Sequence, residues 1–129
     1  MKSALELYGS RVDHVKVADG VATVHLSHAY IHQSAKTPGK DPGTGWSQEA
    51  RLVLFDAQVA KLPDTLPDAI ADGRLEVGGI PHELIPLPFA RRGRANLLLE
   101  FEAGGRLEVS GERPQVELLG KATFLETVP

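Results

Sequence analysis

The sequence predicts a single all-β domain, an antiparallel β-sandwich or a partly open barrel of about eight strands with at most one short helix. Three observations support this prediction. Short apolar or alternating runs are separated by Gly, Pro and Asp-Gly turn signals along the whole chain. The length of 129 residues suits one core, and no linker-like segment divides residues 1–129. Apolar residues make up 42% and charged residues 24%, which argues against disorder.

The first predicted hairpin joins residues 12–17 to residues 21–31 through the dipeptide Asp19-Gly20. Asp-Gly is a strong signal for a type I′ turn, because both central residues of that turn need positive φ. A two-residue turn would set His14 directly opposite His25, whereas a three-residue loop would separate these two histidines. The sequence leaves both registers open.

A second hairpin is predicted between residues 97–102 and residues 106–109. A two-residue Gly-Gly turn would set apolar residues opposite the polar residues Glu108 and Ser110, whereas a three-residue loop would pair Phe101 with Leu107 and Leu99 with Val109. One face of the hairpin must be buried, so we expect the register with the three-residue loop.

Two strands of similar sequence are expected elsewhere in the chain, since GRLEVGG at 73–79 recurs as GRLEVSG at 105–111. We interpret the recurrence as two separate strands that use the same residues for the same turn–strand–turn pattern, rather than as a duplicated half. Residues 47–62 allow a helix or a strand, but the run RLVLFDA is apolar on both strand faces and favours a buried strand.

Prolines restrict the remaining segments. Pro63 and Pro67 leave room for at most one short helical turn within residues 62–72. Three prolines between residues 80 and 89 predict an edge strand or an extended loop, because proline cannot donate to a central ladder.

Composition excludes several classes of function. The chain has no cysteine, which rules out disulfide, cysteine–zinc, iron–sulfur and thiol-nucleophile chemistry. Its net charge of −3 argues against a nucleic-acid partner, whose phosphates attract basic proteins. The first residues lack the apolar stretch of a cleaved signal, and no apolar run approaches the ~20 residues of a membrane-spanning helix. We therefore expect a cytoplasmic protein with no membrane partner.

Four of the five histidines lie between residues 14 and 32 and suggest a metal site. On a regular strand His28 and His32 share a face but lie ~13 Å apart, and His25 and His28 point to opposite faces. The workable pair is His14 with His25, whose Cβ atoms would lie ~4.5–5.5 Å apart across the hairpin.

The pair His14 and His25 lacks a third ligand, which would have to come from Asp13, Asp41 or His82. The histidines do not form the His-x-His and Glu pattern of cupin barrels. No cofactor is expected, and a metal at His14 and His25 is the alternative.

Nucleophilic catalysis has no support in the sequence. No Gly-x-Ser-x-Gly motif occurs, and Ser27 and His28 are neighbours that point to opposite sides of a strand. The carboxylates Glu100, Glu102 and Glu108 are typical of a solvated sheet face. We predict no catalytic residue.

The segment from Gln33 to Trp46 is the strongest binding candidate. Its glycines permit backbone conformations that present N–H groups to an anion, and Lys36 and Lys40 add positive charge. It lacks the order of residues of a phosphate-binding P-loop. Trp46 could stack on a ligand or anchor an interface. A second charged cluster, Arg91–Arg94, could bind an oxyanion or an acidic partner.

The leading hypothesis is a non-catalytic binding or protein-interaction module whose working surface lies at residues 33–46. Its partner would be a protein or a small anionic ligand. The candidate ligand-binding residues are His28, Tyr30, His32, Lys36, Lys40, Trp46, Arg91, Arg92 and Arg94. The alternatives are a small metal-dependent enzyme built on His14 and His25, and a structural subunit that forms a homodimer through a sheet edge.

Overall fold

The computed structural model covers all 129 residues and consists of strands and loops, which confirms the all-β prediction. The nine strands, joined in one antiparallel sheet, are β1 (Lys2–Ala18), β2 (Val21–Ser34), β3 (Gly43–Lys61), β4 (Asp68–Val77), β5 (Ile80–His82), β6 (Leu84–Leu87), β7 (Phe89–Ala90), β8 (Arg94–Phe101) and β9 (Arg106–Val128). No helix of a length and hydropathy that could cross a membrane is present.

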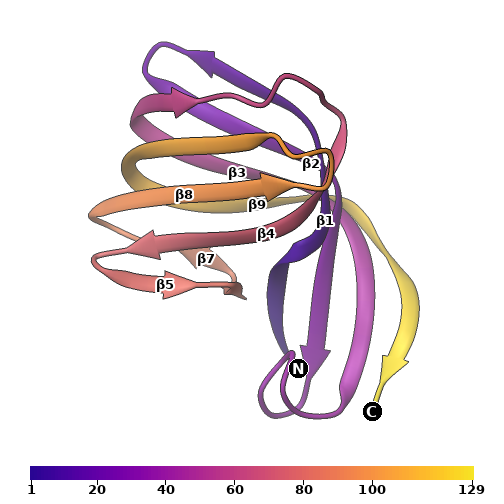
Figure 1. Cartoon of the computed structure of the whole chain (residues 1–129). Helices are drawn as coiled ribbons and strands as arrows, with labels where there is room; N and C mark the ends of the chain where they lie inside the picture. The colour runs from indigo at the N-terminus through magenta and orange to yellow at the C-terminus, as the bar shows by residue number, and fades with distance from the viewer.

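Six strands close into a ring, in the order β1, β2, β3, β9, β8, β4 and back to β1 (Figure 1). The closing contact is short, because β4 meets β1 at only the pairs Arg11–Ala69 and Val12–Asp68. The fold is therefore a partly closed barrel rather than two stacked sheets. Apolar side chains fill the ring, and the largest fully buried ones include Leu26, Leu52, Leu54, Ile70, Leu75, Leu97, Leu99 and Leu107.

Four of the ring strands continue beyond the barrel and form a twisted extension, which we call the arm (Figure 1, lower right). The arm comprises residues 2–7 of β1, 29–34 of β2, 43–48 of β3 and 117–128 of β9. β6 pairs with β1 along one side of it. Both chain termini lie at the arm.

β1 changes register where the arm joins the barrel. Between Glu6 and Arg11 it carries three more residues than the facing part of β2. The buried hydroxyl of Ser10 replaces backbone hydrogen bonds that are missing here. It donates to the Glu6 carbonyl at 2.6 Å and accepts from the Tyr30 amide at 3.0 Å. Ser10 therefore satisfies two backbone groups that would otherwise lose a partner.

β2 contains a bulge at the same junction. Its register with β3 shifts between Leu26 and Ala29, both of which are buried, so Ser27 and His28 lie together on the outer side. The expectation that His25 and His28 point to opposite faces is therefore wrong. The extra residue brings His28 to the side on which His25 already lies.

The first hairpin has the two-residue turn. Asp19 and Gly20 have φ values of 52° and 76°, as a type I′ turn requires, and His14 pairs with His25. This is one of the two registers that the sequence left open.

The second hairpin differs from the expected register by two residues. Leu99 pairs with Leu107 rather than with Val109, and Phe101 meets Gly105, whose carbonyl accepts the Phe101 amide at 2.9 Å. The loop is Glu102–Gly104, one residue earlier than expected, with Gly104 at a φ of 95°. Because the shift is two residues, the buried face is still the expected one.

The strand interpretation of residues 47–62 is confirmed, because residues 47–61 belong to β3. Residues 62–72 contain no helical turn: residues 62–67 form a loop, and residues 68–72 begin β4, a strand that the sequence predicts only from residue 73 on. The two similar segments flank β8, since Leu97 pairs with Leu75 of β4 on one side and with Val109 of β9 on the other. The proline-rich segment forms β5 and β6, which are the two edge strands at opposite ends of the sheet.

Candidate functional site

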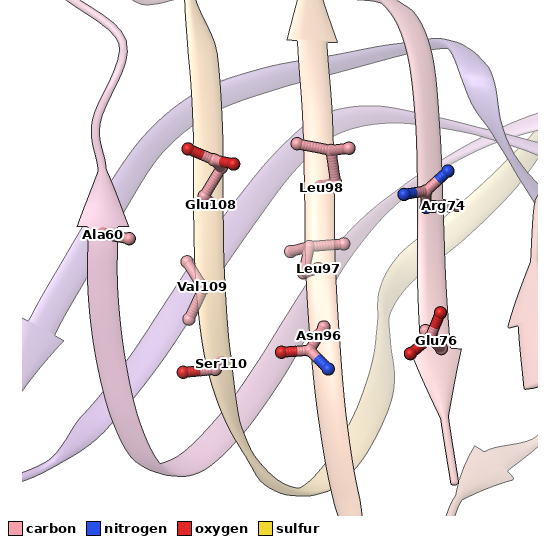
Figure 2. A pocket seen from close by; sticks show the side chains of 9 residues that line it. All are labelled: Ala60, Arg74, Glu76, Asn96, Leu97, Leu98, Glu108, Val109 and Ser110. Carbon is pink, nitrogen blue, oxygen red and sulfur yellow. The ribbon is translucent and has the colours of Figure 1, made fainter. Parts of the chain in front are cut away.

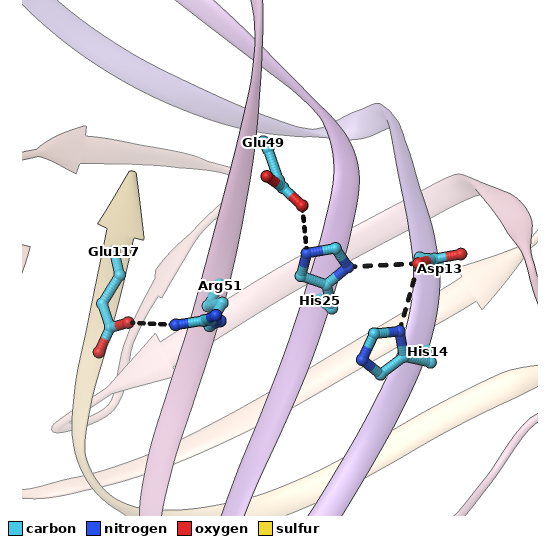
Figure 3. A network of polar contacts seen from close by, with 6 residues as sticks. All are labelled: Asp13, His14, His25, Glu49, Arg51 and Glu117. Carbon is cyan, nitrogen blue, oxygen red and sulfur yellow. Dashed lines mark hydrogen bonds and ion pairs between the residues drawn. The ribbon is translucent and has the colours of Figure 1, made fainter. Parts of the chain in front are cut away.

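A row of charged and histidine side chains crosses the outer face of the barrel (Figure 3). The strand register sets His14 beside His25, His25 beside Arg51, and Arg51 beside Glu117. These residues come from β1, β2, β3 and β9 in turn. Arg51 and Glu117 form an exposed ion pair of 3.4 Å at one end of the row.

Asp13 joins the two histidines because β1 has a bulge there. Val12 faces Leu26 and His14 faces His25, so Asp13 is an extra residue in β1 with no partner of its own. Its carboxylate oxygen Oδ2 lies 3.2 Å from His14 Nδ1 and 3.4 Å from His25 Nδ1. Asp13, one of the three residues that the sequence offers as a third ligand, thus lies beside both histidines.

The second ring nitrogen of His25 is held by Glu49 of β3. Nε2–H donates to the Glu49 carboxylate at 2.6 Å, and the His14 and His25 rings stack with their centroids 4.8 Å apart. His25 Nδ1 is buried and lies at an ion-pair distance from Asp13, but it has no hydrogen bond of good geometry. Asp13, His14 and His25 offer three ligand atoms within 4.8 Å of one another. His82, proposed as a further ligand, lies in β5 against Phe89 instead.

A second polar group lies on the outer face of the arm. The Tyr30 hydroxyl donates to Glu126 of β9 at 2.5 Å, and His32 Nε2 contacts Glu6 of β1 at 2.9 Å. The Tyr30 ring reaches β9 across Gly45 of β3, where an added Cβ would lie 2.1 Å from the phenol oxygen. Gly45 is therefore needed for a close approach and not for a positive φ.

Burial and charge alter the protonation of two residues on this face. Burial, the hydrogen bond to Glu126 and the charges of Glu126 and Glu6 raise the pKa of Tyr30 to about 12, so the phenol keeps its proton. Burial lowers the pKa of His28 below its ordinary value, and the ring shares a hydrogen bond with Ser47.

Trp46 lies on the opposite face of the arm from the other predicted ligand residues Tyr30 and His32. Tyr30 and His32 line a hollow of about 380 Å³ together with Glu6, Tyr8 and the last residues of β9. Trp46 lies on the other face, where it packs edge-on against Phe124 at 5.4 Å and lines a hollow of about 280 Å³. A small ligand on one face would not touch both groups.

The loop that was expected to bind an anion is shorter than the sequence suggested. It spans residues 35–42, because Gly43 and Gly45 are part of β3, and only Gly39 has a positive φ. Four of its backbone N–H groups already have partners within the turn: those of Lys36, Thr37, Lys40 and Asp41. What the loop offers an anion is mainly its two lysine side chains.

The arginine turn belongs to the barrel and the lysine loop to the arm. Arg91 and Arg92 lie between β7 and β8, and Arg94 pairs with Glu112 of β9. In Figure 1 this turn is at the left of the barrel, away from the end of the arm. The Arg91 guanidinium covers the Phe89 ring at 4.6 Å. Figure 1 therefore gives no support for a joint cationic site.

A hollow of about 410 Å³ lies on the barrel wall over β4, β8 and β9 (Figure 2). It is lined by Arg74, Glu76, Asn96, Glu108 and Ser110 beside Ala60 and three apolar residues. It contains no histidine or aromatic side chain and none of the predicted ligand residues. The neighbouring Glu100, Glu108 and Arg106 form long surface ion pairs of 3.7 to 4.0 Å, as expected of a solvated face.

One edge of the arm has no neighbour. β9 pairs with β8 and β7 as far as Val116, but its residues 117–128 pair only with β3. The other side of this segment presents an unpaired row of backbone groups. Comparison with models of protein families, with curated proteins and with solved structures finds no match to this chain.

Proposed function

We propose that this protein is a non-catalytic interaction module that assembles through its arm, with a second copy of the chain paired along the free edge of β9. The observation that carries the proposal is the unpaired edge of residues 117–128. Strand addition at such an edge supplies a row of main-chain hydrogen bonds.

The other sheet ends are protected in ways that β9 is not. β5 is three residues long and contains Pro81, and β6 is four residues long and contains Pro86. Short strands and prolines are the usual protection against unwanted pairing. The free segment of β9 is longer and has no proline between Pro114 and Pro129. Its openness favours a role in pairing.

Apolar side chains accompany this open edge. Leu118, Phe124 and Leu125 have exposed fractions of 43, 51 and 44%. Leu118 lines the hollow that contains Trp46, and Phe124 packs against the same indole. Exposed apolar groups gathered at one place on a small protein favour an interaction surface.

Charge complementarity favours a second copy as the occupant. The free segment of β9 carries charges of both signs, with Lys121 between Glu117 and Glu126, so an antiparallel second copy can bring Lys121 of each chain near a carboxylate of the other. Opposite charges in directly opposed positions stabilise a strand pair, whereas like charges destabilise it. The same symmetry would repeat each contact twice.

The test is sedimentation of two charge-reversal variants and of their mixture. Lys121→Glu leaves the segment 117–128 with three carboxylates and no cation, and Glu126→Lys leaves it with two lysines and one carboxylate, so each variant alone should pair less tightly than the native chain. In an equimolar mixture the acidic segment of one variant can pair with the more basic segment of the other. The mixture should therefore recover the dimer mass.

Controls separate loss of association from loss of folding. Ile80→Lys places a charge on an apolar side chain that is 63% exposed at β5, away from β9, and should leave the dimer intact. Circular dichroism should be unchanged in all variants. A native chain that is monomeric up to millimolar concentration, or that binds only a different protein, would overturn the proposal. So would a mixture that stays monomeric.

A further inference from the structure

We propose that Asp13, His14 and His25 form a binding site for a divalent transition metal ion such as Zn²⁺, with Glu49 orienting His25. The donor set is two imidazole nitrogens and one carboxylate oxygen. Zinc takes such ligands, and sites with three protein ligands keep one position open. The site is separate from the pairing edge, because it lies on the barrel part of β1 and β2.

The distances between the donors suit an ion held among them. Ligand atoms that lie ~2.0–2.2 Å from a tetrahedral ion are about 3.4 Å from each other. Asp13 Oδ2 lies 3.2 Å from His14 Nδ1 and 3.4 Å from His25 Nδ1. All three donors are within 4.8 Å of one another. The His14 ring stacks on the His25 ring, so it would have to turn for its Nδ1 lone pair to point at the same ion, and its side chain is 61% exposed.

The hydrogen bond of His25 Nε2 to Glu49 leaves Nδ1 free to bind a cation. Its Nε2–H donates to Glu49 at 2.6 Å, which leaves the lone pair of Nδ1 in a neutral ring facing the Asp13 carboxylate. Two electron-rich atoms at 3.4 Å repel unless a proton or a metal ion lies between them. Nδ1 is buried and has no other partner.

Glu49 has the position of an outer-shell carboxylate. Histidine ligands of metals almost always donate their second N–H to a carboxylate, a carbonyl or a water, which fixes the ring and raises its basicity (Figure 3). Arg51, which pairs with His25 across β2 and β3, is directed to Glu117 at 3.4 Å. The scaffold is two adjacent barrel strands, so the donors are held on rigid elements.

An ion at this site would be accessible from solvent. The side chains of Asp13 and His14 are 44 and 61% exposed. The open coordination position would take water or an anionic ligand such as a carboxylate. This would give the barrel a ligand-binding function in addition to the association proposed for the arm.

The experiment is calorimetric titration of the untagged full-length protein with Zn²⁺, followed by Co²⁺ absorption spectroscopy. We expect saturable binding of a single ion and the visible bands of four-coordinate Co²⁺. His25→Gln, His14→Gln and Asp13→Asn should each weaken binding by about tenfold or more, and Glu49→Gln by about 10–100-fold. His82→Gln, at a histidine outside the cluster, should bind as the native protein does.

Thermal unfolding without metal shows whether each variant is folded. If His25→Gln does not fold, the exposed position His14 decides the outcome. No saturable binding by the native protein would overturn the proposal, and so would equal affinity in His14→Gln and the native chain. A loss of affinity in His82→Gln as large as in His14→Gln would also contradict it. None of these results depends on whether the protein is a dimer.

Discussion

The barrel and the arm share four strands, yet the two halves of one of these strands, β9, have different environments. In the barrel half of β9, Leu107 is fully buried and Val109 is 2% exposed. In the arm half of the same strand, Leu118 and Phe124 are 43 and 51% exposed. The difference arises because the barrel closes on itself and the arm does not. In β9, closure of the ring buries alternate side chains, whereas the open end of the arm leaves apolar side chains exposed.

The two regions also differ in how polar groups are placed. The barrel wall carries the cluster of Asp13, His14 and His25, fixed by a tight hairpin and one bulge. On the arm the polar groups reach across strands, as Tyr30 does over Gly45 to Glu126. We infer that the barrel supplies stability and a fixed set of polar side chains, while the arm supplies a surface for association.

The largest effect is expected from truncation in the barrel. Leu99→Ala removes a fully buried side chain and should cost about 2–5 kcal/mol of unfolding free energy. Leu118→Ala, at the exposed arm position, should change the stability of the monomer by less than about 0.5 kcal/mol. Urea denaturation at low protein concentration measures both. Similar losses of unfolding free energy at the two positions would contradict the difference between the barrel and the arm.

Gly45 tests the packing of the arm itself. Gly45→Ala would place a Cβ 2.1 Å from the Tyr30 oxygen, so the ring must move and give up Glu126. We expect a loss of about 1–3 kcal/mol, the usual cost of overpacking. In a Tyr30→Leu background the same change should be nearly neutral, and a double-mutant cycle measures the difference. Equal costs in both backgrounds would contradict the account of Gly45.

Ser10 tests the junction between the regions. Ser10→Ala leaves the Glu6 carbonyl and the Tyr30 amide without their shared partner in a buried place, at a cost of about 1–3 kcal/mol. Hydrogen exchange should accelerate at Tyr30 more than at Leu99 of the barrel. Unchanged exchange at Tyr30 would show that the hydroxyl is not needed for the ladder.

The smallest effect is a pH dependence from His28. Its pKa is lowered by burial in the folded chain, whereas in the unfolded chain it is near ~6.5. Below that pH the unfolded state binds the proton first, so His28 contributes to a fall in stability as the pH decreases from neutral. His28→Asn should reduce the difference between urea midpoints at pH 7.5 and pH 5.5. An unchanged difference between the two midpoints would exclude His28 as a source of the pH dependence.

Much of the fold could be predicted because its signals are local. The alternation of Leu97, Leu99 and Phe101 reports which side of a strand is buried, and Asp19-Gly20 has few alternatives to a tight turn. Three prolines between residues 80 and 89 mark the segment that forms the protected edges. These features depend on neighbours in the chain rather than on distant strands.

The candidate sites depended on bulges, which leave little trace in sequence. One extra residue at Asp13 brings a carboxylate to two histidines, and another at Ser27 and His28 reverses the side of every later residue of β2. The presence of a bulge depends on how strands pair across the sheet. The only sequence signal for the cluster of Asp13, His14 and His25 is the adjacent pair Asp13-His14 close to a strong hairpin turn. The sequence predicts Trp46 at the end of a loop, because the glycines at positions 43 and 45 do not reveal that β3 already begins at Gly43.

Hydrogen exchange at two protein concentrations tests the central claim, that the barrel is closed and the arm is open for pairing. We predict that backbone amides within residues 117–128 exchange more slowly at high concentration, where copies pair, while amides of residues 106–112 are unaffected because β8 already covers them. Exchange at residues 117–128 that does not depend on concentration would contradict the account.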